Sequence, residues 1–77
     1  MRIRLYGRLA DAIAPEIELP GDGCTVGELR QRLAADHAAA AQSLARSRVL
    51  IGDRVVGDDR AVADLDELEF LPPVSGG

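Results

Sequence analysis

Apolar residues open this chain with a spacing of two, which is typical of a half-buried β-strand. Ile3 and Leu5 share one face of the segment RIRLYGRL, and polar side chains alternate with them. We therefore predict a strand over residues 2–8. A second short alternation, EIELP at residues 16–20, ends at the turn-forming residues 21–23. The two segments predict a hairpin with a long connection.

The spacing changes to three and four after residue 24, which indicates a helix. Residues 25–28, Thr-Val-Gly-Glu, have the form of a capping box, in which Thr25 accepts from the backbone three residues on and Glu28 reaches back. Residues 30–32 are expected to face water. The apolar stripe of the helix comprises Val26, Leu29 and Leu33.

The alanine-rich segment 34–45 either extends this helix or forms a second one, because alanine favours helix without marking a boundary. Leu44 is its expected core contact. Beyond it, the apolar runs 49–51 and 55–56 flank Gly-Asp-Arg and predict a hairpin. Residues 61–66 are expected to form a loop with a helical turn.

A last strand is predicted over residues 67–71, with Leu68 and Phe70 on one face and Glu69 and Leu71 on the other. The element order predicts an α+β fold: a mixed sheet of four to five strands with one main helix packed on one face. The first and last strands are expected to be neighbours at its centre.

Length and composition narrow the possible functions. A chain of 77 residues buries only about 60% of the surface that it exposes when unfolded, which disfavours a deep catalytic cleft. The net charge of −4 argues against nucleic acid as a partner. No apolar run is long enough to cross a membrane and residues 1–7 do not resemble a leader, so we expect no membrane partner and a cytoplasmic location.

The residue types that usually carry chemistry are isolated here. One cysteine, Cys24, cannot form an internal disulfide and is expected to be a buried structural residue. His37 has no partner at a metal-binding spacing and is expected to lie at the surface. The acidic residues between 58 and 69 lack the pattern of a calcium loop. We predict no metal site and no catalytic triad.

The remaining feature is the ending FLPPVSGG. Pro72 and Pro73 favour an extended spacer of about 3.1 Å per residue, so residues 72–77 could project roughly 19 Å. Gly76 and Gly77 have no Cβ and could therefore enter a narrow channel. A strand is followed by a stiff spacer and then by two glycines. This order favours a chain end that is held out toward a partner over one that is merely disordered.

The ending EFLPPVSGG resembles that of the ubiquitin-like sulfur carriers, most closely the small subunits of molybdopterin synthase, which end in Phe-Pro-Pro-Val-x-Gly-Gly. The predicted strand order is similar to the β-grasp fold of that family. The resemblance implies a β-grasp domain over residues 1–71 and a projecting flexible tail over residues 72–77. It also implies that the chain is not catalytic alone but serves as a co-substrate and small subunit of a sulfurtransferase.

The resemblance further implies a chemistry for the chain end. An E1-like adenylating enzyme would use ATP to activate the carboxylate of Gly77, which follows Gly76, and a sulfur donor protein would supply the sulfur of a thiocarboxylate. The large molybdopterin synthase subunit would receive that sulfur in molybdenum cofactor biosynthesis, and the chain itself would hold no cofactor. The implied partner-binding residues are Leu71, Pro72, Pro73, Val74 and Ser75.

Three alternatives stay open at this point. The chain could carry sulfur for thiamin or cysteine biosynthesis, although Pro-Pro-Val before the glycines favours molybdopterin synthase. It could be a ubiquitin-like modifier that is joined through Gly77 to lysines of other proteins. It could also be an interaction domain whose tail has no chemical role.

Overall fold

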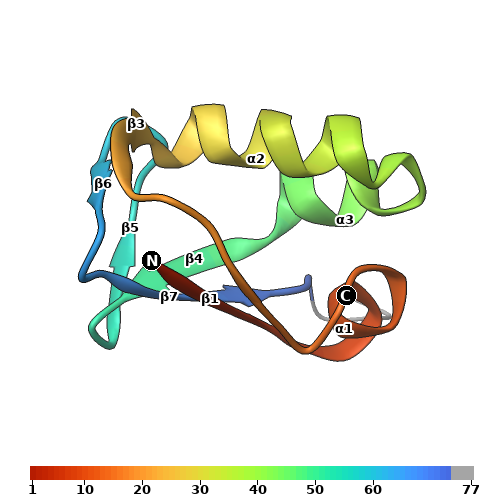
Figure 1. The fold of residues 1–77 in the computed structure, drawn as a ribbon. Coiled ribbons are helices and arrows are strands. Elements are labelled where there is room, and N and C mark those ends of the chain that lie inside the picture. The colour runs from red at the N-terminus through yellow and green to blue at the C-terminus, as the bar shows by residue number, and fades with distance from the viewer. Residues whose placement is uncertain (74–77) are drawn as a thin grey trace.

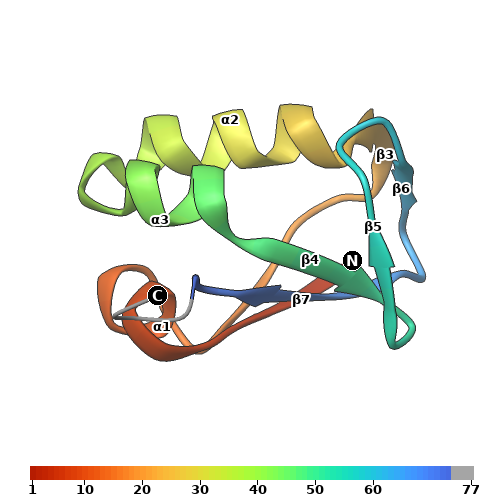
Figure 2. The same cartoon turned by 180° about the vertical axis from the view of Figure 1, so that it is seen from behind.

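Figure 1 shows the computed structural model, which describes residues 1–73: a sheet lies below, and two helices cross one of its faces. Helix α2 runs along that face, α3 turns back beneath the second half of α2, and α1 lies at the end of the sheet where the described chain stops (Figures 1 and 2). The strands are β1 (Arg2–Leu5), β2 (Glu16–Glu18), β3 (Asp22–Thr25), β4 (Arg48–Ile51), β5 (Arg54–Val56), β6 (Ala61–Ala63) and β7 (Glu67–Leu71). The helices are α1 (Gly7–Ala12), α2 (Val26–Asp36), the 3-10 turn η1 (Ala38–Ala40) and α3 (Ala41–Arg46).

The strand order confirms the predicted α+β fold. Five strands form one mixed sheet in the order β2-β1-β7-β4-β5. The last strand, β7, is central: it pairs in parallel with β1, where Leu5 is opposite Phe70, and antiparallel with β4, where Val49 is opposite Phe70. The predicted hairpins are present as β1–β2 and β4–β5. The main helix α2 packs on one face, as the periodicity required.

The core lies between that sheet face and the helices. Leu68 and Phe70 point inward and are fully buried, which confirms the predicted phase of the last strand. The helix stripe and Leu44 are buried against them, also as predicted. The largest fully buried side chains are Phe70, Ile3, Leu9, Leu29, Leu44, Leu68, Val26, Val49 and Val62. Since only one of these is aromatic, shape complementarity among aliphatic side chains supplies most of the packing.

The predicted first strand over residues 2–8 was too long by three residues, because the strand ends at Leu5. Gly7 turns the chain with a φ of +56°, a left-handed conformation that glycine adopts without strain. Helix α1 begins there and buries Leu9 in the core. The long connection of the predicted hairpin is therefore largely helical.

A small second sheet was also missed. Strand β3, where we predicted a turn, pairs antiparallel with β6, where we predicted a loop with a helical turn. Cys24 and Val62 are buried from these two strands, which confirms the structural role expected for the cysteine. The pairing joins distant segments through an irregular register, Asp22 with Ala63 and Thr25 with Ala61. Such pairing leaves no local periodicity in either segment.

The alanine-rich segment resolves into two helical pieces. Helix α2 ends at Asp36, and the backbone of His37 leaves the helical region with φ −135° and ψ 70° before η1 and α3 follow. His37 is half-buried at this break, where we expected a surface residue. The change of direction allows Leu44 to reach the core that α2 already covers.

Arg30 was expected to face water, and the structure contradicts this. Its side chain is only 15% exposed and donates hydrogen bonds to the Leu44 carbonyl, to Ser47 Oγ (2.6 Å) and to Asp58 (2.9 Å). Its guanidinium carbon also lies 6.0 Å from the centroid of the Phe70 ring. The polar head satisfies groups at the end of α3 while its stem covers the core, so Arg30 joins α2 to α3.

The predicted capping box at the start of α2 is present. Thr25 Oγ1 accepts from the Glu28 amide at 3.1 Å, and a Glu28 carboxylate oxygen accepts from the Thr25 amide at 2.9 Å. The bond from the Thr25 amide favours the charged form of Glu28 and lowers the pKa of its carboxyl group. The capping box thereby satisfies two of the backbone donors that this helix end leaves without an intrahelical partner.

We expect the Glu28→Gln variant to lose part of the pH dependence of folding. Because the folded-state pKa of Glu28 lies below its ordinary value of 4.5, the contribution of this group is present above that pH and is lost as the pH falls through the folded-state value. The stability gap between the native chain and the variant should therefore narrow on acidification. Urea unfolding between neutral and acidic pH measures it, with Glu18→Gln on β2 as the control; a constant gap would contradict the assignment.

Candidate docking site at the carboxyl-terminal strand

Strand β7 fixes the direction in which the chain leaves the domain. Hydrogen-bonded partners lie on both sides of it, and Leu68 and Phe70 anchor it in the core. Leu71 lies on the opposite face, as predicted, but is half-buried rather than fully exposed. Pro72 and Pro73 are also half-buried, so the tail begins against the domain surface.

The turn between β1 and α1 contacts the first tail residue. A Cβ placed on Gly7 would lie 3.0 Å from Cγ of Pro72, so only glycine fits this approach without displacement. Next to it, the Tyr6 amide donates to the Phe70 carbonyl at 3.3 Å. The sequence analysis missed this contact, although a glycine that interrupts an alternating run is itself a signal of a bend.

We expect the Gly7→Ala variant to be less stable than the Gly52→Ala variant. The two glycines share a φ of +56°, so alanine meets similar backbone strain at each, but only Gly7 has a neighbour within 4 Å, namely Pro72. The extra cost should be about 1–3 kcal/mol, as is typical of overpacking. Urea denaturation of both variants measures it. Adding Pro72→Ala to Gly7→Ala should recover the difference; equal losses for the two glycine variants would show that the contact with Pro72 is unimportant.

A hollow of about 350 Å³ opens beside the start of the tail, lined by Arg46, Arg48, Leu71, Pro72 and Pro73. Arg48 begins β4 directly opposite Leu71, so both belong to the outer face of the sheet. Three of the predicted partner-binding residues, Leu71 and the two prolines, are thus brought together. The combination of apolar side chains with exposed cations at the base of the tail suits docking rather than catalysis.

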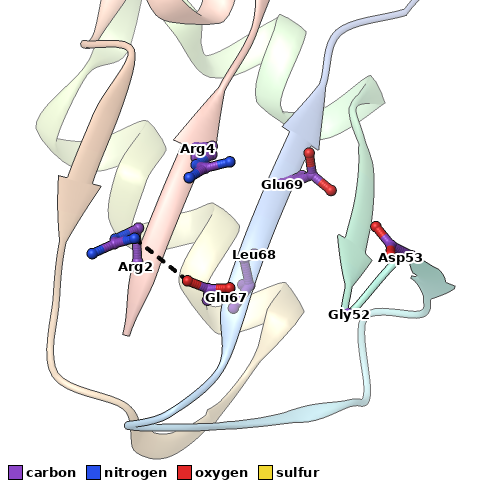
Figure 3. Close-up of a pocket in the computed structure, with 7 residues that line it drawn as sticks. All are labelled: Arg2, Arg4, Gly52, Asp53, Glu67, Leu68 and Glu69. Carbon is purple, nitrogen blue, oxygen red and sulfur yellow. Dashed lines mark hydrogen bonds and ion pairs between the residues drawn. The ribbon is translucent and has the colours of Figure 1, made fainter.

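The outer sheet face at the other end of β7 carries a second hollow of about 230 Å³, shown in Figure 3, and both of its arginines form ion pairs. Arg2 lies 3.5 Å from Glu67, and Arg4 lies 3.5 Å from Glu16. Such exposed pairs contribute little to stability. The hollow holds no nucleophile next to a base, so it offers no catalytic arrangement. Its lining residues are Arg2, Arg4, Gly52, Asp53, Glu67, Leu68 and Glu69.

Tyr6, next to the tail, and Cys24, in the small β3–β6 sheet, have side chains with shifted pKa values. The Tyr6 hydroxyl donates to Glu69 at 2.7 Å, and this hydrogen bond to the carboxylate raises the pKa of Tyr6. Burial raises the pKa of the Cys24 thiol, which disfavours the reactive thiolate.

Within residues 1–73, no group of three histidine, cysteine, aspartate or glutamate side chains could hold a metal ion. No helix in this part of the chain is long and apolar enough to cross a membrane.

The remaining predicted site residues, Val74, Ser75, Gly76 and Gly77, lie outside the described residues. The sequence analysis did not single out Gly7, Arg46 or Arg48. An exposed arginine has no distinguishing sequence pattern, and only the pairing of β4 with β7 brings Arg48 to the tail.

The five-stranded mixed sheet, with its parallel central pair β1 and β7 and with α2 packed across one face, defines a ubiquitin-like β-grasp protein. Comparison with known proteins places it more narrowly. Residues 3–77 match the ThiS family, and the chain belongs to that family. This confirms the resemblance to ubiquitin-like sulfur carriers that the ending of the chain indicated.

Individual relatives agree with this placement. The chain is 37% identical to the molybdopterin synthase sulfur carrier subunit of Escherichia coli K12, over all of this chain and 99% of that protein. The crystal structure of SAMP1 from Haloferax volcanii superposes with a TM-score of 0.73 at 26% identity, covering 99% of this chain and 97% of that one. A putative molybdopterin converting factor subunit 1 from Pyrococcus furiosus shares the fold, with a TM-score of 0.75, 23% identity and 95% coverage of each chain.

Proposed function

We propose that this protein is the sulfur carrier subunit of a molybdopterin synthase and that it donates sulfur from a thiocarboxylate at Gly77. The observation that carries the proposal is the 37% identity, over the full length of both chains, to the Escherichia coli protein of that name. The Pro-Pro-Val-x-Gly-Gly ending supports the same assignment. In this function the large synthase subunit is the acceptor partner, and the pathway is molybdenum cofactor biosynthesis.

The chemistry begins with a carboxylate that is unreactive toward nucleophiles. An E1-like enzyme would direct a Gly77 carboxylate oxygen to the α-phosphorus of ATP, forming an acyl adenylate and releasing pyrophosphate. Sulfide delivered by a donor would then attack the acyl carbon and expel AMP, leaving a thiocarboxylate without any change of oxidation state. Both reactions take place in partner active sites, so the chain is a co-substrate, holds no cofactor and is not an enzyme alone. We expect it to act in the cytoplasm.

The folded domain holds the chain end where a partner can reach it. Since β7 is held between two strands and Pro72 rests against Gly7, the tail has a defined starting point. In the proposed division, residues 1–71 form the docking domain and residues 72–77 the tail that enters the partner. Leu71, Pro72 and Pro73 would contact the partner at its entrance, Val74 and Ser75 would continue inward, and Gly76 would allow passage of the reactive end.

A reconstitution tests the proposal directly. The chain is incubated with an E1-like enzyme, ATP and hydrosulfide, and intact mass spectrometry should then show one oxygen replaced by one sulfur. Adding the large synthase subunit and a cyclic pterin precursor should convert the precursor and return the chain to its original mass. A chain that gains sulfur but never passes it to the pterin precursor would overturn the molybdopterin assignment while leaving a role as a sulfur carrier for thiamin or cysteine biosynthesis.

A second candidate is a ubiquitin-like protein modifier. It is favoured by the likeness to SAMP1, small archaeal modifier protein 1, which extends over 99% of this chain. In that function the adenylated Gly77 would be joined to lysine amines of other proteins. Recovery of isopeptide-linked Gly-Gly remnants on other proteins from cells would establish it.

A further inference from the structure

The arginines of this chain divide into paired and unpaired sets. Among residues 1–73, five of the nine basic residues lie within 4 Å of a carboxylate: Arg2, Arg4, Arg30, Arg32 and Arg60. The other four have no such partner in this part of the chain: Arg8 and Arg54, which stand apart, and Arg46 and Arg48, which are close in sequence. Among the described residues, then, no carboxylate pairs with Arg46 or Arg48, although the protein has a net charge of −4.

These two arginines lie together at one place. Figure 2 shows α3 leading directly into β4, and the register sets the first residue of β4, Arg48, opposite Leu71 at the end of β7. Arg46 and Arg48 line the same hollow as Leu71, Pro72 and Pro73. The hollow therefore combines two exposed guanidinium groups with the apolar side chains of Leu71, Pro72 and Pro73 at the start of the tail.

A purely structural role accounts for only half of this arrangement. Arg46 stands in the last turn of α3, where a cation is favourable because helix carbonyls accumulate negative charge. Arg48 belongs to a strand and faces outward, so no helix end explains it. The two cations lie beside an apolar surface, and this combination suits a partner that carries negative charge.

We propose that Arg46 and Arg48 dock the carrier onto its activating enzyme through carboxylates that line the mouth of the recess receiving the tail. The apolar contacts of Leu71 and the prolines would lie inside that acidic rim. This inference rests on the proposed function, because it requires the tail to enter a partner. We choose the activating enzyme because every sulfur pathway and the modifier function begin with adenylation of Gly77.

The test measures ATP–pyrophosphate exchange by the activating enzyme as a function of carrier concentration. Arg46→Glu and Arg48→Glu should each raise the KM for the carrier about tenfold at low salt and leave kcat at saturation unchanged, because docking is weakened while the tail is intact. The milder Arg46→Gln and Arg48→Gln variants should show smaller increases. At about 1 M salt, where the Debye length falls to about 3 Å, the differences should largely disappear.

Arg54→Glu is the matched control. Arg54 is also an exposed strand arginine without an ion-pair partner among residues 1–73, but it belongs to β5 and does not line the hollow. Its reversal changes the net charge equally and should leave KM within about twofold of the native value. A KM for the Arg46 and Arg48 variants equal to that of Arg54→Glu would overturn the inference. Absence of exchange with the native chain would instead refute the proposed function.

Discussion

Deleting Gly77, or adding one residue after it, is expected to abolish thiocarboxylate formation while leaving the folded domain unchanged. In the proposed function the terminal carboxylate is the only reactive group that the protein supplies. A displaced end misses the reacting atoms of the partner, and a misplacement of about 1 Å can already reduce a rate about 100-fold. Intact mass spectrometry after incubation with the activating enzyme, ATP and hydrosulfide measures the loss.

Two measurements make this result interpretable. Thermal unfolding of the altered chains should match that of the native chain, because the anchoring contacts of β7 end at Leu71 and the Gly7 contact involves Pro72. Binding of the altered chains to the activating enzyme should persist, since the docking residues are intact. If chains with a changed end still acquire sulfur as well as the native chain does, the carrier mechanism has to be abandoned.

Replacing Phe70 by alanine is expected to cost about 3–5 kcal/mol of folding free energy. A chain of 77 residues has a total stability of about 4–12 kcal/mol, so the variant should lose a large part of its stability. Phe70 is fully buried in the central strand and also lies beneath the Arg30 guanidinium group. Its removal leaves a cavity at the centre of the core and removes the cation–π contact.

Urea denaturation followed by circular dichroism measures this effect, with Leu71→Ala as the control at the adjacent, half-buried position. The control should lose far less stability, because its side chain lies on the outer face. Comparable losses at the two positions would show that the core is not centred on Phe70.

The sequence predicted the main sheet and helix because burial imposes a period on each of them. In β7, Leu68 and Phe70 alternate with less buried residues, and a shift of one residue would have placed Glu69 in the core. The stripe of α2 was equally unambiguous. The pairing of first and last strands followed from the requirement that a mixed sheet cover one helix face.

Other features depend on contacts that no local pattern encodes. The β3–β6 sheet exists because Val62 can be buried when two distant segments meet. Arg30 was assigned to water from its charge, but its long side chain reaches acceptors on α3. At the candidate site, the ending of the chain predicted Leu71 and the prolines, whereas Arg48 joins them only through the register of β4 with β7.

The position of β7 between β1 and β4 also bears on how the protein is made. The ladder that completes the sheet joins Arg2 to Glu67 and Leu5 to Phe70, so the first strand emerging from the ribosome must wait for the last. Contacts of such long sequence separation form late, after the cost of closing the intervening chain has been met. A chain released early would lack its central strand and could not assemble the sheet. Every folded molecule has consequently been synthesised to the end of β7, and folding itself excludes chains that are truncated within or before this central strand.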